Sequence, residues 1–272
     1  VAFFTKANAG LTFKFSDSSP FAFNWIADAA FVTAGASTTA VSFYLDHKNN
    51  FPEWDGNLGD LSKVNAFDRW AARPFNKTLH VTGTILTGAE LLFTPALIAG
   101  EAFFGSLPKQ EILPAATMFI EAFMLSYGTK EILKRSALRY RPYMYFDGYP
   151  EDKVAEGDFQ YSWPSGHTTN AFLGATFTCC MMNYYFAESS WRLPVNICAF
   201  SVAVATGTLR VLSGNHFITD VLTGAALGSF CGFIVPFVHR KLAQSVESKS
   251  NGAIQNLAVN FIPSGVCVSF NF

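Results

Sequence analysis

Charged residues are scarce in this chain of 272 residues. Asp, Glu, Lys and Arg make up 14% of it, whereas a soluble domain carries about 25%. Hydrophobic residues make up 50%. The net charge is only -1, so no strong positive field attracts nucleic acid. This composition indicates a membrane protein and argues against a nucleic-acid-binding protein.

The sequence also lacks the patterns of a metal site. No group of carboxylates resembles a site for a divalent cation. Cysteine does not supply one either, because the five cysteines have no metal-ligand spacing and four lie in apolar runs, where cysteine behaves as a small hydrophobic residue. They are Cys179, Cys180, Cys198, Cys231 and Cys267. We therefore expect no metal and no cofactor.

Six apolar stretches are close to the length of about 20 residues that crosses a membrane as a helix. Three contain no charged residue: Thr168–Ala187, Leu193–Leu209 and Val221–Val238. Three others contain a few: Trp25–Leu45, Val81–Gly105 and Ile112–Leu133. We predict an all-α polytopic membrane bundle with six transmembrane helices. A soluble helical protein with very apolar buried helices is the alternative.

Three acidic residues lie inside the stretches that carry charge. They are Asp28, Glu90 and Glu121. Ionisable groups within a membrane are costly unless they find a partner. We expect these side chains to form hydrogen bonds between helices or to lie near the membrane surface.

The two ends of the chain differ from its middle. Residues Leu11–Phe15, Leu257–Phe261 and Val266–Phe272 alternate apolar and polar side chains, with Pro263-Ser264-Gly265 between the last two. Alternation predicts strands and Pro-Ser-Gly predicts a turn, so we expect a small terminal β-hairpin. With six spans both ends lie on one side of the membrane, where we expect a small sheet to join them.

No internal repeat and no low-complexity linker divides the chain. We expect one integral-membrane domain over residues 1–272, with a core at 80–240 and strand-like segments at 1–20 and 251–272. The long loop between the third and fourth spans is rich in acids, which we expect mainly to keep it soluble. These acids are Asp147, Glu151, Asp152, Glu156 and Asp158.

Three clusters of basic residues and histidine follow one another along the chain. They are Lys134 with Arg141-Pro142, then Pro164-Ser165-Gly166-His167, then Arg210 with His216 and Asp220. Phosphoryl transfer spreads negative charge over the phosphate oxygens, which positioned cations stabilise. In a chain with six spans all three clusters lie on the same side of the membrane. Their order and common side predict one phosphoryl-transfer site.

The first two clusters each have a local reason to contact phosphate. Lys134 and Arg141 share one helical face if the third helix continues that far. Arginine offers a planar fork and lysine a point charge. Ser165 is suited to cap the fourth helix, and Gly166 lets backbone approach an anion at the helix N-terminus. His167 then lies one step inside that anion site.

The third cluster supplies a nucleophile. His216 and Asp220 are four residues apart, so on a helix they face the same way. A carboxylate on one ring nitrogen fixes the tautomer and leaves the other nitrogen free to attack phosphorus. Arg210 adds a further phosphate donor.

The three clusters resemble the motifs of the type 2 phosphatidic acid phosphatases, whose clade includes vanadium-dependent haloperoxidases and bacterial acid phosphatases. The resemblance covers roughly residues 80–240, including the helix order. One position departs from the pattern. The family usually has Ser just before the arginine of the third motif, whereas this chain has Leu209, which bears on how Arg210 is positioned.

The resemblance implies a role for each residue. His216 attacks phosphorus and becomes a phosphohistidine, Asp220 orients it, and His167 protonates the leaving oxygen and then activates water. No metal is implied. The phosphate oxygens are held by Lys134, Arg141, Ser165, the Gly166 amide and Arg210.

These features favour a metal-independent membrane phosphatase acting on lipid phosphates or pyrophosphates. Candidate substrates are polyisoprenyl pyrophosphates, phosphatidic acid and phosphatidylglycerol phosphate. Two alternatives use the same site: a phosphotransferase with a lipid or sugar acceptor, and a vanadium-dependent haloperoxidase, against which the apolar stretches argue. A transporter or scaffold would not need the complete catalytic set. The expected partners are the lipid substrate and membrane lipids, with no nucleic acid.

The orientation in the membrane rests on two opposing signals. The resemblance places the site on the non-cytoplasmic face. Lys and Arg number twelve on the site side and seven on the other, which under the positive-inside rule points the site inward. Without the three catalytic cations the counts are nine and seven. We expect a bacterial inner-membrane protein with its site on the non-cytoplasmic side.

Overall fold

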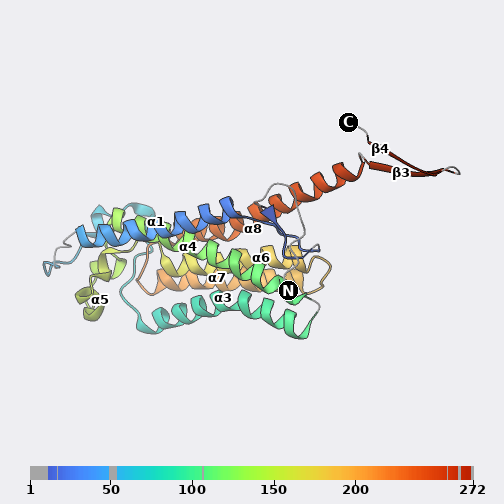
Figure 1. Cartoon of the computed structure of the whole chain (residues 1–272). Helices are drawn as coiled ribbons and strands as arrows, with labels where there is room; N and C mark the ends of the chain where they lie inside the picture. The colour runs from blue at the N-terminus through green and yellow to red at the C-terminus, as the bar shows by residue number, and fades with distance from the viewer. Residues whose placement is uncertain are drawn as a thin grey trace.

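The computed structural model is a bundle of long helices that run roughly alongside one another (Figure 1). It describes residues 12–16, 18–48, 54–105, 107–255, 257–262 and 265–270. Within these residues the long helices are α1 (Trp25–Lys48), α3 (Lys77–Phe104), α4 (Ile112–Ala137), α6 (Gly166–Tyr185), α7 (Arg192–Leu212) and α8 (Ile218–Gln255). Shorter helices occupy the connections: η1 (Leu61–Lys63), α2 (Ala66–Arg69), η2 (Lys109–Glu111), η3 (Pro142–Tyr145), α5 (Glu151–Ala155) and η4 (Asp158–Gln160).

Five helices in the described part of the chain are long and apolar enough to cross a membrane. These candidates are Trp25–His47, Lys77–Phe104, Lys109–Tyr145, Arg192–Leu212 and Ile218–Ser248. The expectation of six such helices is therefore corrected to five by length and composition. The remaining long helix, α6, contains most of the stretch 168–187, but it is not among the helices that are apolar enough to be candidate spans.

The position of α6 explains its composition. It lies at the centre of the bundle, where it contacts α3, α4, α7 and α8. Twelve of its 20 residues are buried, including the polar side chains of Thr168, Thr169 and Thr178. A helix surrounded by other helices needs little lipid-facing apolar surface, and small residues allow close packing. Hydropathy alone therefore underestimates how deeply α6 is buried.

A stripe of glycines on α8 lets its backbone approach that of α6. The three glycines are spaced by four residues, so they lie on one helical face. A Cβ at Gly224 would lie 2.6 Å from the carbonyl oxygen of Ser165, and a Cβ at Gly232 would lie 2.7 Å from that of Leu173. A Cβ at Gly228 would collide with the carbonyl oxygen of Thr169. Only glycine fits this interface.

The outer faces of α1, α3 and α7 expose large apolar side chains. A soluble monomer rarely exposes such extended apolar surface, whereas a membrane helix presents it to lipid. The exposed residues include Trp25, Ile26, Phe43, Ile85, Leu92, Phe103, Leu193, Ile197 and Val204.

The strands form two separate antiparallel pairs. β3 (Leu257–Ile262) pairs with β4 (Gly265–Phe270), which confirms the predicted terminal hairpin. It lies beyond the end of the bundle, at the tip of α8 (Figure 1). β1 (Thr12–Phe13) pairs instead with β2 (Phe23–Asn24), directly before α1. The expectation of one sheet joining the two ends is therefore wrong for the described strands. Pro263 and Ser264 of the predicted turn lie outside the described residues.

The acids within the apolar stretches have different surroundings. Glu121 lies 2.9 Å from His239 of α8, which confirms a contact between helices for this residue. Asp28 approaches the same histidine at 3.9 Å. Glu90 of α3 is buried against Gly174 of α6, and its Oε1 has no partner among the described residues.

We predict that Gly228→Ala destabilises the bundle by about 1–3 kcal/mol, because the new methyl group must push α6 and α8 apart. Thermal unfolding of the detergent-solubilised protein measures the effect. Gly88→Ala on α3 is the matched control, since nothing lies within 4 Å of a Cβ there. Equal melting temperatures for the two variants would contradict the close α6–α8 contact.

Candidate active site

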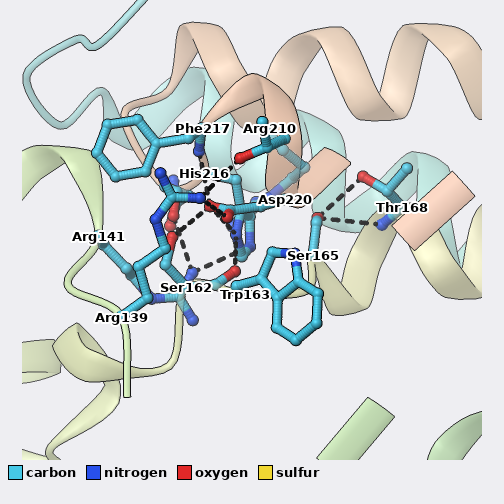
Figure 2. A network of polar contacts seen from close by, with 12 residues as sticks. Arg139, Arg141, Ser162, Trp163, Ser165, Thr168, Arg210, His216, Phe217 and Asp220 are labelled. Atoms are coloured by element: carbon cyan, nitrogen blue, oxygen red, sulfur yellow. Dashed lines mark hydrogen bonds and ion pairs between the residues drawn. The ribbon is translucent and has the colours of Figure 1, made fainter. Parts of the chain in front are cut away.

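The three clusters meet at the end of the bundle where α4 and α7 end and α6 and α8 begin. Figure 2 shows the network, with His216 and Asp220 at its centre and the Ser165–Thr168 contact to one side. The loops before α3 and before α6 cover it. All eight residues expected at the site lie in these elements.

A tight turn between α7 and α8 positions His216. Gly214 has φ +71°, and a Cβ there would lie 2.5 Å from the carbonyl oxygens of Arg73 and Pro74. The turn is closed by the backbone N–H of His216, which donates to the carbonyl of Arg210 at 3.2 Å. Since α8 begins only at Ile218, His216 precedes the helix. The expectation that it shares a helical face with Asp220 is therefore corrected.

The imidazole of His216 is held by backbone. Its Nδ1 lies 2.7 Å from the carbonyl oxygen of Ser162. A carbonyl only accepts, so Nδ1 carries the proton and Nε2 keeps its lone pair. Arg141 Nη1 lies 3.0 Å from Nε2. Asp220 Oδ2 is 3.7 Å from Nδ1, beyond hydrogen-bond distance, so the Ser162 carbonyl sets the tautomer.

His216 is neutral at physiological pH. Burial, together with the charges of Arg141 and Arg210, lowers the pKa of His216 well below its usual 6.5. A neutral imidazole with a free lone pair is the nucleophilic form.

Asp220 supports the loops that hold His216. Its carboxylate accepts from Ser162 Oγ at 2.5 Å, from the Phe217 N–H at 2.8 Å and from Arg139 Nη1 at 2.5 Å. The first two bonds fix Ser162, whose carbonyl binds Nδ1 of His216, and Phe217, which follows His216 in the chain. Asp220 thus orients His216 through its neighbours.

Arg139 and Asp68 complete this support, and the sequence patterns did not identify either of them. Arg139 reaches Asp220 on one side and Asp68 Oδ2, at 2.8 Å, on the other. Its guanidinium lies 4.2 Å from the centre of the Phe217 ring. Asp68 also accepts from the Thr219 N–H at 2.9 Å. Arg139 therefore joins the α1–α3 loop to the start of α8.

Arg141 lies on extended backbone before η3. The helix α4 ends at Ala137, because Leu138 has a left-handed conformation with φ 44°. Lys134 and Arg141 therefore do not share a helical face. Arg141 donates through Nε to the carbonyl of Asp158 at 2.9 Å and through Nη2 to its carboxylate at 2.6 Å.

Asp158 is a third residue that the sequence patterns did not identify. It belongs to the acids expected only to keep the loop soluble, yet it anchors a buried arginine. Burial raises the pKa of Asp158, but the Arg141 guanidinium outweighs it and holds the pKa below its usual range. The carboxylate stays charged and keeps Arg141 pointing at His216 Nε2.

The start of α6 has free backbone N–H groups of the kind that can bind an anion. Ser165 caps the helix as predicted, accepting from the Thr168 N–H at 3.4 Å and contacting Thr168 Oγ1 at 2.9 Å. The Ser165 N–H donates to the carbonyl of Asp220 at 3.0 Å. A Cβ at Gly166 would lie 3.4 Å from Lys134 Nζ. The Lys134 ammonium therefore lies close to the N-terminus of α6.

Arg210 is held by His80, a further residue that sequence patterns did not single out. Arg210 Nη1 lies 3.1 Å from His80 Nδ1 and donates to the His80 carbonyl at 3.2 Å. A Cβ added at Gly83 would lie 3.4 Å from Cδ of Arg210, so α3 packs closely against this side chain. With Leu209 in place of the family serine, contacts from α3 position the buried arginine.

His167 lies beside His80, the residue that contacts Arg210. The rings of His80 and His167 are 6.3 Å apart, and His167 Nε2 contacts Thr84 Oγ1 at 3.1 Å. Thr84 and His80 both belong to the first two turns of α3. The imidazole of His167 therefore packs against the start of α3.

Comparison with known proteins matches this arrangement to one family. A profile of the PAP2 superfamily matches residues 115–243, a range that contains all eight residues from Lys134 to Asp220. The central part of the chain is therefore similar to the PAP2 superfamily. The matched range ends before the β3–β4 hairpin and begins after α3.

Two curated proteins are similar to part of this chain. It is 30% identical over 137 residues to a PA-phosphatase related-family protein of Dictyostelium discoideum, covering 46% of this chain and 48% of the relative. It is 34% identical over 124 residues to phosphatidylglycerophosphatase B of Bacillus subtilis, covering 44% and 57%. The chain thus spans about half the length of these relatives.

A solved PAP2 structure is also similar. It is the first transmembrane PAP2 type phosphatidylglycerolphosphate phosphatase from Bacillus subtilis, with 25% identity and a TM-score of 0.47. The match covers 77% of this chain and 97% of the solved one.

We predict that Arg139→Gln destabilises the protein by about 3–5 kcal/mol, because Asp68 and Asp220 lose a shared cation while both stay buried. Arg139→Lys restores little, since an ammonium lacks the fork that reaches two carboxylates. Denaturant unfolding of both variants measures this. Arg192→Gln, at the exposed start of α7, is the control. A loss below about 1 kcal/mol for Arg139→Gln, as for an exposed ion pair, would contradict the bridge.

Proposed function

We propose that this protein is a membrane phosphatase that removes phosphate from lipid phosphates or pyrophosphates through a phosphohistidine, without a metal. The observation that carries the proposal is the geometry of His216. Its Nδ1 is bound to the Ser162 carbonyl at 2.7 Å, which leaves the Nε2 lone pair facing Arg141 at 3.0 Å. A phosphate bound to Arg141 would bring its phosphorus next to that lone pair.

In the first step Nε2 of His216 forms a bond to phosphorus while the bond from phosphorus to the leaving oxygen breaks. Arg141, Arg210 and Lys134 stabilise the negative charge on the other phosphate oxygens, aided by the Gly166 amide at the N-terminus of α6. Ser165 contributes by capping this helix. As phosphorus takes the lone pair, the imidazole becomes positive and its Nδ1–H bond to Ser162 strengthens.

His167 handles the protons. In its protonated form it donates to the leaving oxygen, which departs as a hydroxyl group. The neutral imidazole then takes a proton from water, whose oxygen attacks phosphorus and breaks the bond to Nε2. Inorganic phosphate leaves, and both histidines return to their first state. The negative charge of a bound phosphate favours protonated His167 among the surrounding cations.

The substrate class follows from the setting of the site. The names of two relatives refer to phosphatidic acid phosphatases and phosphatidylglycerophosphatase, which act on phosphorylated lipids. A cavity of about 650 Å³ flanks Asp158 and offers room for a headgroup. Its aromatic lining consists of Trp54, Tyr149, Phe159 and Tyr161. Such rings suit a pocket at headgroup level.

The membrane arrangement is part of the proposal. With α6 as a sixth span, shielded from lipid by its neighbours, both ends of the domain lie on one side and the site on the other. We place the site on the non-cytoplasmic face of a bacterial inner membrane. Lipid phosphates of the outer leaflet would reach it laterally.

We predict that detergent-solubilised protein releases phosphate from lipid phosphates in excess chelator, and that His216→Ala lowers the rate at least about 1,000-fold. His47→Ala, which removes an exposed histidine on α1, is the matched control and keeps the rate. A panel of phosphatidic acid, phosphatidylglycerol phosphate, polyisoprenyl pyrophosphate and a soluble phosphate ester ranks the substrates. Release that requires a divalent metal, or that persists in His216→Ala, would overturn the mechanism.

A further inference from the structure

Three metal-ligating side chains gather at the end of the bundle away from the phosphate site. Asp28 of α1, Glu121 of α4 and His239 of α8 each bring one ligand atom within 4.8 Å of the others. Along α8, His239 follows Asp220 by 19 residues, which is about 28 Å of helix. The group is therefore separate from the machinery around His216.

The distances between the ligand atoms match those between neighbouring ligands in a small coordination site. His239 Nε2 lies 2.9 Å from Glu121 Oε2 and 3.9 Å from Asp28 Oδ1. Zinc binds nitrogen and oxygen ligands at about 2.1 Å, so ligand atoms in a tetrahedral site are about 3.4 Å apart. The two observed distances lie on either side of this value. A cation at the centre needs only small side-chain movements.

The orientation of His239 is that of a ligand. Its Nδ1 lies 3.0 Å from the carbonyl oxygen of Ala22, so Nδ1 carries the proton and Nε2 faces the two carboxylates. Metal-ligating histidines commonly donate their other N–H to a backbone carbonyl in this way. Ala22 in turn donates its N–H to the His239 carbonyl at 3.1 Å. The ring of Phe23 covers the imidazole at 4.4 Å.

The carboxylates lack the positive charge that burial requires. Glu121 is only 1% exposed, yet its Oε1 has no hydrogen-bond partner in the described part of the chain. Asp28 Oδ1 has none among these residues either, and its contact with His239 Nε2 is 3.9 Å long. An imidazolium would balance one carboxylate and leave the other uncompensated. Arg240, the next residue after His239, donates to the carbonyl of Pro20 instead. Unpartnered buried carboxylates are costly.

We propose that Asp28, Glu121 and His239 bind one divalent transition-metal ion, with zinc the best match to one imidazole and two carboxylates. With neutral His239, a divalent cation balances both carboxylates. Asp28, whose side chain is 17% exposed, provides the entry path, and water completes the coordination. The ion clamps α1 to α4 and α8 and fastens the segment around Ala22 and Phe23. It is structural, and the chemistry at His216 does not depend on it.

The test measures zinc content and thermal stability of the whole chain. Protein purified in detergent is stripped with chelator, dialysed and incubated with zinc chloride. Wild-type protein is expected to retain about one zinc per chain, and zinc is expected to raise its Tm by about 3 °C or more. Glu121→Gln and Asp28→Asn should each lose both effects.

Matched controls locate the ion. Glu90→Gln makes the same change at another buried acid, on α3 outside the cluster, and should keep the zinc and the rise in Tm. His216→Ala removes a histidine from the phosphate site and should keep them too. If His216→Ala loses the zinc, the metal belongs to the phosphate site and the proposal is overturned.

Two further results would also overturn the proposal. In the first, wild-type protein retains no zinc, and its Tm is the same in the presence and absence of zinc. The cluster would then be an ion pair only. The other is equal zinc content in Asp28→Asn and wild type. Asp28 is the least buried of the three ligands, so Asp28→Asn decides the matter if Glu121→Gln fails to fold. Phosphate release is not needed for either readout.

Discussion

The close backbone contact between α6 and α8 is the constraint on which the phosphate site depends. The glycines of α8 leave no side chain between it and the carbonyl oxygens of α6. This contact holds the start of one helix against the start of the other, so the Ser165 N–H reaches the Asp220 carbonyl. The backbone N–H groups at the start of α6 and the histidine before α8 are therefore fixed relative to each other. A displacement of about 1 Å would separate phosphate from nucleophile.

Charge balance determines the rest of the pocket. Arg141 and Arg210 are buried, and each is aimed by a neighbour: Asp158 for the first and the backbone and ring of His80 for the second. Burial, together with their charges, holds the pKa of His216 well below its usual value. A bound phosphate would supply the missing negative charge. The same field that suppresses protonation of the nucleophile thus favours the substrate.

Several features were predictable because their causes are local. Ser165 caps α6 since a serine before a helical stretch accepts from the backbone two or three residues on, and the hairpin at 257–270 follows from alternation around a Pro-Ser-Gly turn. In both cases neighbouring residues carry the whole signal. The common side of the three clusters differs, because it follows from counting spans along the whole chain.

Features that arise from distant contacts were not predictable. The left-handed Leu138 ends α4 before Arg141, and no sequence pattern marks it. Arg139 owes its role to Asp68, 71 residues away, and His239 faces Glu121 from 118 residues away. The pairing of β1 with β2 instead of the far end likewise depends on how residues 12–24 pack against α8. Hydropathy alone does not mark α6 as a membrane helix, because neighbouring helices surround it.

The most direct test of the central claim is to trap the phosphoryl group on His216. His167→Ala should allow attack on an aryl phosphate, whose leaving group needs no proton, but should slow the hydrolysis that follows. Rapid denaturation, mass spectrometry of the peptides and phosphorus NMR would then locate the group. We predict phosphate on Nε2 of His216, in line with the proton that the Ser162 carbonyl holds on Nδ1. Phosphate on Nδ1, or on another residue such as Ser165, would contradict the geometry described above.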